Sequence, residues 1–205
     1  MTASLAAGRT TVHLVRHGEV ENPTGIIYGR LPGYNLSERG LRQAAEAAER
    51  LRHADVGAVW ASPLERAQET AAIIAEPHAL DVVTDVRLTE SDTTFEGATR
   101  NVLGVLKSPR YWWSFRNPMR PSWGETFVEI KARMVAAVDD AVAQAGSREV
   151  VIVSHQTPVR VARLTLGRSR LPPWLPFTPC ETGSITTLAL DSGRILSASY
   201  FKPRA

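Results

Sequence analysis

The chain has 205 residues, of which 43% are hydrophobic and 22% are charged, and its formal net charge at pH 7 is +3. A chain of this length buries enough apolar surface for one well-formed core, so we expect a single domain. The basic residues are scattered and the net charge is small, which disfavours a nucleic-acid-binding protein. The single cysteine, Cys180, excludes an intrachain disulfide and a cysteine-based zinc cluster.

The sequence gives no sign of a membrane segment or of export. No apolar run approaches the roughly 18 residues that a membrane-spanning helix needs, and the first residues lack the apolar core of a signal peptide. We therefore expect a cytoplasmic protein with no membrane partner. Residues 1–10 are expected to form a flexible tail. Residues 11–205 are expected to form the domain, with an aromatic and proline-rich insertion at about 98–123.

Predicted strands and helices alternate along the chain. A short apolar run that stops at a charged or glycine-containing turn indicates a buried strand, and an Ala-, Glu- and Arg-rich stretch after a capping residue indicates a helix. In chain order we expect a strand at 12–15, a loop at 20–36, a helix at 41–52, a strand at 55–60, a helix at 64–75, a strand at 80–86, a helix at 125–145, a strand at 149–153, a helix at 157–166, and strands at 185–190 and 195–201.

This alternation predicts the fold class. Strands that are apolar throughout, alternating with helices, are typical of a mostly parallel sheet that helices cover on both faces. The expected fold is therefore α/β, with three layers in the order helix, sheet, helix. The last two strands flank Asp191-Ser192-Gly193, which predicts a hairpin between them.

Cationic and imidazole side chains follow three of the predicted strands. Arg16 and His17 come after the first strand, Arg66 shortly after the second, and His155 after the strand at 149–153. Because ligands bind beyond the carboxyl ends of the strands in such sheets, we expect these groups to converge into an anion site. A metal site built from His17 and His155 is the competing interpretation. It fits poorly, because adjacent arginines repel a dication and carboxylate ligands are lacking.

Several motifs occur in one order along the chain. They are Leu-Val-Arg-His-Gly-Glu at 14–19, Ser-Pro-Leu-Glu-Arg-Ala-Gln-Glu-Thr-Ala at 62–71, an acid-bearing segment at 88–97, Gly-Glu-Thr at 124–126 before Arg133, and Val-Ser-His at 153–155 with Arg160. Together they resemble the motifs of the histidine phosphatase superfamily, also called the phosphoglycerate mutase-like family. One Arg-His-Gly alone would be a weak signal, because tripeptides recur by chance, but ordered motifs spanning residues 12–190 are specific.

The resemblance implies a covalent route in which His17 attacks phosphorus and becomes a phosphohistidine. His17 must then be neutral, with one ring nitrogen free and the other bonded to a backbone carbonyl. The family implies that Arg16, Arg66 and a protonated His155 clamp the phosphoryl oxygens. These cations should also oppose protonation of His17. Gly18 is expected to allow close backbone approach at the turn and to contact phosphate.

The family takes the proton for the leaving group from a carboxylic acid. Glu90 is our candidate, and it would later deprotonate the water that hydrolyses the phosphohistidine. The stretch from Glu90 to Glu96 is one residue shorter than the usual pattern, so Asp92 competes for this role.

Other positions depart from the family pattern or lie outside its motifs. Gln156 stands where many members have glycine, and its backbone N–H can still donate to phosphate in a bulkier pocket. Pro23 stands where many members have asparagine, which makes Asn22 and Thr24 candidates for the missing donor. Arg30, on the loop at 20–36, is either a surface cation or a substrate contact.

The insertion interleaves arginines with aromatic residues. Such a pattern is compatible with stacking on single-stranded nucleic acid, with a cap over a substrate pocket, or with simple packing. We favour packing with a substrate-facing cap, in which Arg116 or Arg120 contacts an anionic leaving group. Outside the motifs, His13, His53 and His78 are expected to be structural, and Cys180 an inert small residue.

These features predict a phosphomonoester hydrolase that acts on a small phosphorylated metabolite and needs no metal or other cofactor. The chain is shorter than the glycolytic mutases and lacks their long basic insertion, which favours hydrolysis over mutase-type phosphotransfer. A catalytically inactive phosphate-binding module is a third interpretation, disfavoured because the nucleophile and the clamp residues are all present. A homodimer is common in the family, but the sequence identifies neither the oligomeric state nor the leaving group.

Overall fold

A computed structural model gives the fold, and it describes residues 8–98, 124–166, 178–192 and 194–205. The insertion at 98–123, with Arg116 and Arg120, lies outside the described residues except for Ala98. No helix among the described residues is long and apolar enough to cross a membrane.

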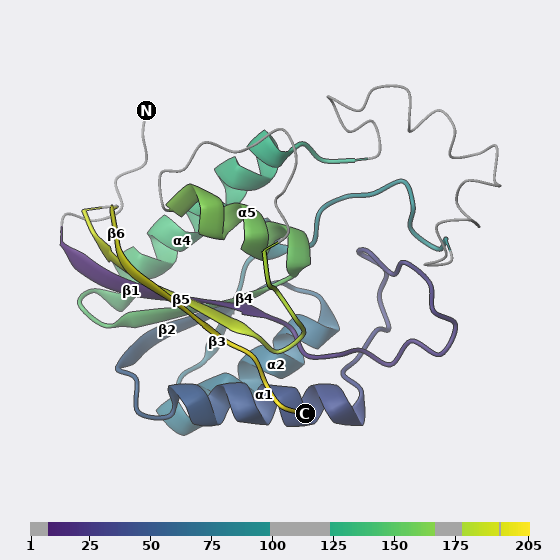
Figure 1. Cartoon of the computed structure of the whole chain (residues 1–205), viewed down its shortest axis with the longest axis horizontal. Coiled ribbons are helices and arrows are strands. Elements are labelled where there is room, and N and C mark those ends of the chain that lie inside the picture. The colour runs from purple at the N-terminus through teal and green to yellow at the C-terminus, as the bar shows by residue number, and fades with distance from the viewer. Residues whose placement is uncertain (1–7, 99–123, 167–177, 193) are drawn as a thin grey trace.

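The described strands form one six-stranded sheet in the order β3-β2-β4-β1-β5-β6 (Figure 1). Their bounds are β1 Arg9–Arg16, β2 Val56–Ala61, β3 Val82–Thr84, β4 Glu149–Ser154, β5 Ile185–Asp191 and β6 Arg194–Phe201. Strands β3, β2, β4 and β1 pair in parallel, whereas β5 pairs antiparallel with β1 and β6 antiparallel with β5. The predicted mostly parallel sheet and the terminal hairpin are confirmed.

Helices cover both faces of the sheet, which confirms the three-layer α/β fold (Figure 1). Helices α1 and α2 pack on one face, and α4 and α5 pack on the other. Their bounds are α1 Glu38–Leu51, α2 Glu65–Ala75, α4 Phe127–Ala145 and α5 Gln156–Leu166, with short 3-10 turns at Glu76–His78 (η1) and Val86–Leu88 (η2).

The central strand β4 shows why its sequence is apolar throughout. Val150 and Ile152 point into the core beneath α4 and α5, while Val151 and Val153 point into the core beneath α1 and α2. All are fully buried, because successive side chains of a strand face opposite sides and both sides are covered here. Each such side chain contributes about 1.5–3 kcal/mol relative to exposure.

Parallel pairing brings the carboxyl ends of β1, β2 and β4 to one edge of the sheet. Arg16 in β1 is in register with Ser154 in β4. The pairing continues past the strand ends, where His17 N donates to Ser154 O and Ser62 N donates to Val153 O. The residues that follow the three strands therefore lie side by side.

The structure corrects the expected boundaries at several points. Strand β1 begins at Arg9, and Arg9 and Thr10 pair with β5, so the expected tail at 1–10 is wrong for these two residues. The strand expected at 80–86 is limited to β3, because the Asp85 side chain accepts from Arg87 N and starts the turn η2. Helix α4 begins two residues later than expected, because Thr126 and Glu129 form a capping box.

Candidate active site

His17 is held in a single tautomer at the end of β1. Its side chain is buried, and Nδ1 lies 2.7 Å from the carbonyl oxygen of Gly18. A carbonyl only accepts hydrogen bonds, so Nδ1 carries the proton and Nε2 keeps a free lone pair. Burial, followed by the charges of Arg16 and Arg66, lowers the pKa of His17 well below its ordinary value. His17 is therefore neutral at physiological pH and in the protonation state of a nucleophile.

A second turn of the chain fixes the backbone at His17. Gly183 N lies 3.0 Å from both Arg16 O and His17 O, and Arg16 N donates to Ser184 O. Together with the bond from His17 N to Ser154 O, these contacts hold the turn on both sides. The position of the imidazole is thus set by main-chain bonds from β4 and from the segment before β5.

Gly18 packs closely against α1. A Cβ at Gly18 would lie 2.5 Å from Gly40 O in α1, a distance at which backbone must move. Its N–H donates to Thr70 Oγ1 at 3.1 Å. The predicted close approach is therefore an approach to α1, and the Gly18 N–H is already committed within the protein.

Arg66 is the largest fully buried side chain of the described residues. Its guanidinium donates to Gly29 O at 2.6 Å from Nη2 and lies 4.8 Å from the ring centroid of Tyr28. The buried Nε and Nη1 have no acceptor among the described residues. Leaving buried donors unpaired is costly, so the site is built to offer them to an anion.

Two more buried donors without an acceptor in the described part of the chain flank His17. Arg16 donates from Nη1 to Cys180 O at 2.7 Å, while its Nε is unpaired. His155 is fully buried beside His17, with ring centroids 5.1 Å apart, and its Nδ1 is unpaired. These groups and Arg66 converge on the nucleophile as the charge pattern predicted, and His53 and His78 lie elsewhere.

The expected protonation of His155 differs from what its surroundings favour. Its Nε2 lies 2.7 Å from Ser62 Oγ. Burial, and then the neighbouring His17, Arg66 and Arg16, lower its pKa well below the ordinary value. The imidazole by itself is therefore neutral. A phosphoryl dianion beside Nδ1 would act in the opposite direction, because an anion favours the charged form.

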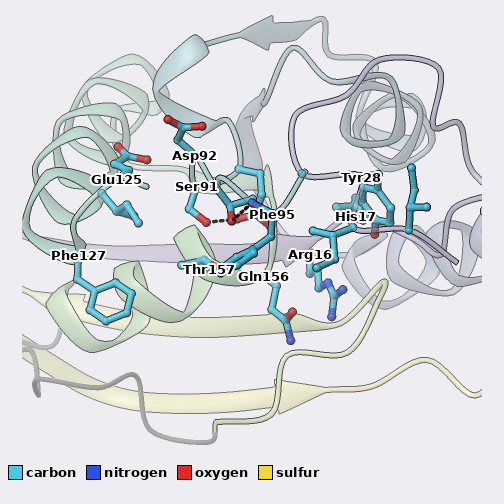
Figure 2. Close-up of a pocket in the computed structure, with 16 residues that line it drawn as sticks. Arg16, His17, Tyr28, Ser91, Asp92, Phe95, Glu125, Phe127, Gln156 and Thr157 are labelled. Carbon is cyan, nitrogen blue, oxygen red and sulfur yellow. Dashed lines mark hydrogen bonds between the residues drawn. The ribbon is translucent and has the colours of Figure 1, made fainter. Parts of the chain in front are cut away.

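A cavity of about 430 Å³ extends from His17 toward Phe127 (Figure 2). Arg16, His17 and Tyr28 form one end, and Glu125 and Phe127 form the other. The remaining lining residues are Ile26, Ile27, Gly29, Glu90, Ser91, Asp92, Thr93, Phe95, Ile130, Gln156 and Thr157. The volume is in the range of small-molecule sites.

The two candidate acids, Glu90 and Asp92, differ in their surroundings. Both carboxylates line the cavity, but Glu90 is half-buried, and its charge acts directly on Arg66. Glu90 Oε1 accepts from Ser91 N at 2.8 Å and from Ser91 Oγ at 3.2 Å, which orients the carboxyl group. Asp92 is exposed and points away from Arg16 and His17 (Figure 2).

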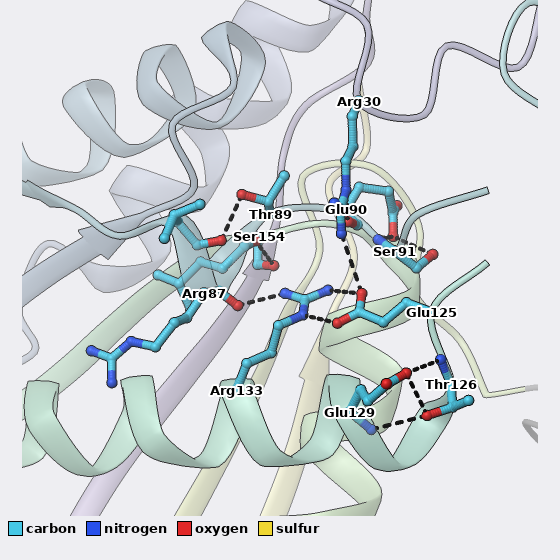
Figure 3. A network of polar contacts seen from close by, with 12 residues as sticks. Arg30, Arg87, Thr89, Glu90, Ser91, Glu125, Thr126, Glu129, Arg133 and Ser154 are labelled. Atoms are coloured by element: carbon cyan, nitrogen blue, oxygen red, sulfur yellow. Dashed lines mark hydrogen bonds and ion pairs between the residues drawn. The ribbon is translucent and has the colours of Figure 1, made fainter. Parts of the chain in front are cut away.

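The segment that carries Glu90 is fastened to the sheet and to the loop at 20–36 (Figure 3). Ser154, which precedes His155 in the sequence, donates from Oγ to Leu88 O at 2.6 Å. Arg30 Nε donates to Glu90 O at 2.7 Å. We expected Arg30 to be either a surface cation or a substrate contact. It does not line the cavity, and its bond to Glu90 O supports the Glu90 segment.

Glu125 ties this segment to α4 (Figure 3). Arg133 donates to both carboxylate oxygens of Glu125, at 2.6 and 2.9 Å, and a third nitrogen donates to Arg87 O. Arg30 Nη2 adds a contact to Glu125 at 3.3 Å. One carboxylate thus joins α4, the Glu90 segment and the loop at 20–36.

The remaining candidates fall into three groups. Gln156 lines the cavity at the start of α5. The Asn22 side chain bonds the backbone N and O of Ile26, and Thr24 is exposed; neither residue lines the cavity. Arg116 and Arg120 lie outside the described residues.

Sequence reasoning missed two residues that contact the catalytic groups. Ser62 holds His155, and its only sequence signal is its place as the first residue of the motif at 62–71. Tyr28 lies against Arg66 and, edge on, against His17 with centroids 6.5 Å apart. No pattern singles out Tyr28 in a loop rich in glycine and proline, because only the tertiary fold places it there.

The donor set suits an anion and not a metal. The unpaired nitrogens of Arg16 and Arg66 are N–H donors, whereas a metal needs lone pairs. Among the described residues, no three His, Cys, Asp or Glu side chains cluster closely enough to hold a metal ion. A phosphoryl group, with its three oxygens, is the ligand that such donors match.

Residues 12–201 match the family model of the histidine phosphatase superfamily (branch 1). The chain belongs to this superfamily. The resemblance seen in the motifs is therefore confirmed, and it extends over nearly the whole chain.

Members of this superfamily with different activities are similar to the chain. It is 51% identical over 199 residues to the uncharacterized protein Rv0525 of Mycobacterium tuberculosis, covering 96% of this chain and 98% of that one. It is 45% identical over 192 residues to a 2,3-bisphosphoglycerate-dependent phosphoglycerate mutase of Thermoplasma acidophilum, covering 90% and 89%. The solved structure of mycobacterial glucosyl-3-phosphoglycerate phosphatase Rv2419c superposes with a TM-score of 0.74 at 26% identity, covering 94% and 97%.

Proposed function

We propose that this protein is a phosphomonoester hydrolase that forms a phosphohistidine on His17 and uses no metal or other cofactor. One observation carries the proposal. A neutral imidazole with a free Nε2 lies among buried nitrogens of Arg16, Arg66 and His155 that have no hydrogen-bond partner in the described part of the chain. A nucleophile beside an unfilled set of cationic donors is the arrangement that phosphoryl transfer requires.

The proposed reaction has two steps. In the first, His17 Nε2 attacks phosphorus, the bond from phosphorus to the ester oxygen breaks, and Glu90 donates a proton to the departing alkoxide. In the second, Glu90 takes a proton from water, the water oxygen attacks phosphorus, and the phosphorus–nitrogen bond breaks to release inorganic phosphate. Glu90 thus ends the cycle protonated, as it began.

The cations supply most of the stabilisation in this scheme. At an effective dielectric constant near 20, a cation about 4 Å from a phosphoryl charge contributes on the order of 4 kcal/mol before desolvation is subtracted. Arg16 and Arg66 are arginines in fixed orientations, so little reorganisation accompanies the reaction. On binding, a dianion would raise the pKa of His155, and the protonated imidazole would add a third positive charge.

A phosphoglycerate mutase is the second candidate, favoured by the 45% identity to the Thermoplasma acidophilum enzyme. Such an enzyme must hold a substrate with two anionic groups in two orientations and return the phosphoryl group from histidine. Hydrolysis is the stronger proposal, because Arg16 is the only arginine or lysine among the described residues that line the cavity.

The test is phosphate release from benzyl phosphate in the presence of EDTA, with quenching in alkaline detergent to trap the labelled phosphoenzyme. We expect turnover and an acid-labile, alkali-stable phosphoenzyme in the wild type, and neither in His17→Asn. Exchange between 2- and 3-phosphoglycerate without net hydrolysis would replace the proposal by the mutase. Stabilisation by inorganic phosphate without any turnover would indicate a binding module.

A further inference from the structure

The two ends of the cavity differ in their chemistry. The end at His17 is lined by Arg16, whose Nε is unpaired, whereas the described lining of the far end, toward the start of α4, combines apolar side chains with carboxylates (Figure 2). Since Glu90 lines the cavity beside the proposed phosphoryl position, the leaving group that it protonates must extend toward the far end. The far end therefore determines which alcohol the site accepts.

Apolar side chains form the body of the far end. Phe127 and Ile130 come from the first turn of α4 and pack against the core beneath α4 and α5, and Ile130 is fully buried. Phe95 and Ile27 also line the cavity, from the two loops that border it. Burial of apolar surface is favourable in proportion to its area, so a ring-sized group on the leaving alcohol is stabilised by contact with these side chains.

The arginines near the far end are already committed. Arg133 uses three nitrogens on Glu125 and Arg87 O, and Arg30 is bonded to Glu90 O and Glu125 (Figure 3). Capture of a substrate carboxylate by either arginine would compete with the bonds that hold the Glu90 segment. Among the described residues, the far end therefore offers apolar contact in preference to a second anion site.

The described lining of the far end also carries carboxylates. Asp92 is exposed there, whereas the charge of Glu125 is offset by its ion pairs with Arg133 and Arg30. An acidic group on the leaving alcohol would lie near these oxygens. Like charges at such distances repel, although solvent weakens the repulsion at an exposed group such as Asp92.

We infer that the preferred substrate is a monophosphate ester of an alcohol with an apolar body and no second acidic group. This inference rests on the proposed hydrolase activity and narrows it from small phosphorylated metabolites in general. It separates the protein from enzymes whose substrates carry a carboxylate or a second phosphate on the leaving group.

Three esters of equal reactivity test the inference: benzyl, 4-carbamoylbenzyl and 4-carboxybenzyl phosphate. The carboxamide and the carboxylate have the same shape, so their comparison isolates the charge. We expect kcat/KM for 4-carboxybenzyl phosphate to be about tenfold lower than for the carbamoyl ester at low ionic strength. Benzyl phosphate should also be hydrolysed with at least tenfold higher kcat/KM than glycerol 3-phosphate.

Matched variants locate the effect in the cavity. Asp92→Asn should narrow the difference between the carboxylate and carboxamide esters, whereas Asp81→Asn, which removes an exposed charge before β3, should not change it. Phe127→Ala should raise KM for benzyl phosphate several-fold. Val128→Ala, at the next position of α4 where the side chain is 70% exposed, should leave KM unchanged.

The outcomes separate the two proposals. If the carboxylate ester is hydrolysed as fast as or faster than the carboxamide, the substrate class is wrong and the hydrolase stands. If none of the esters is hydrolysed and no phosphoenzyme forms from any of them, the proposed function itself is wrong. Equal responses of the paired variants would place the leaving group outside this cavity and overturn the inference.

Discussion

His13 and His17 lie four residues apart along β1 and its end, both are buried, and their surroundings differ in one respect. His13 has both ring nitrogens bonded, Nδ1 with Thr187 Oγ1 at 2.9 Å and Nε2 with Glu149 Oε2 at 2.6 Å. His17 has one nitrogen bonded and one free. Burial lowers the pKa of both. Burial and a lowered pKa therefore do not distinguish a nucleophile; unsatisfied bonding capacity beside unpaired cations does.

The position in the strand explains this difference. His13 lies in the middle of β1, where the neighbouring strands β4 and β5 supply partners on either side. His17 lies past the last strand pair, where the sheet ends and the cavity begins. A strand interior satisfies its polar groups, whereas a strand end can leave one open for a ligand.

The largest effect is expected from removing the free nitrogen. His17→Asn should lower kcat/KM for benzyl phosphate by at least about 10³-fold, because the covalent intermediate cannot form. Its free energy of unfolding, measured in urea, should be no lower than that of the wild type. The substitution removes an imidazole whose burial away from water is itself unfavourable. Retention of more than a few per cent of the activity would move the nucleophile elsewhere.

Glu90→Gln is expected to give the next largest loss, and the loss should depend on the leaving group. For benzyl phosphate, which leaves as a basic alkoxide, kcat/KM, which reports the transfer to His17, should fall by about 10² to 10⁴-fold. For 4-nitrophenyl phosphate, which needs no proton, the fall should be less than about tenfold. The same dependence on leaving group in Asp92→Asn would assign the acid role to Asp92 instead.

Arg66→Lys tests whether the fork of unpaired N–H groups matters, because lysine keeps the charge and loses the planar geometry. We expect kcat/KM to fall by about 10² to 10³-fold. Arg52→Lys, at an exposed ion pair with Glu49, is the matched control and should leave kcat/KM unchanged. A loss below fivefold in a folded Arg66→Lys would show that charge alone suffices.

His13→Leu should have the opposite consequences to His17→Asn. It leaves Thr187 and Glu149 without their partner, so the free energy of unfolding should fall by about 1–3 kcal/mol in a urea titration. The value of kcat/KM should stay within twofold of the wild type. Loss of activity at unchanged stability would mean that His13 also belongs to the site.

The smallest effect is a pH dependence of stability. The pKa values of His13, His17 and His155 are all lowered from an unfolded value of 6.5. The unfolded chain therefore binds more protons below pH 6.5, and the free energy of unfolding should decrease as pH falls from 6.5 toward the folded pKa values. The slope contributed by each histidine is at most about 1.4 kcal/mol per pH unit. Urea titrations at pH 7.5, 6.5 and 5.5 without phosphate should show a shallower slope in His17→Asn.

Much of this protein could be predicted from local patterns. The apolar run at 149–153 is visible because a strand covered on both faces needs no polar positions. Arg16, His17 and His155 were found because residues at the carboxyl ends of parallel strands share one edge. The choice between Glu90 and Asp92 stayed open, because two carboxylates two residues apart in a loop differ only in the directions that the folded chain imposes on them.

The sequence by itself determined the fold class, the superfamily and the residues able to attack and clamp a phosphoryl group, because these depend on periodicity and on side-chain chemistry. Only the tertiary structure decided the neutral state of His155, the stacking of Tyr28 on Arg66 and the commitment of Arg30 and Arg133 to Glu125. Each of these depends on burial and on partners distant in the chain. Such partners become neighbours only when the sheet and helices have packed.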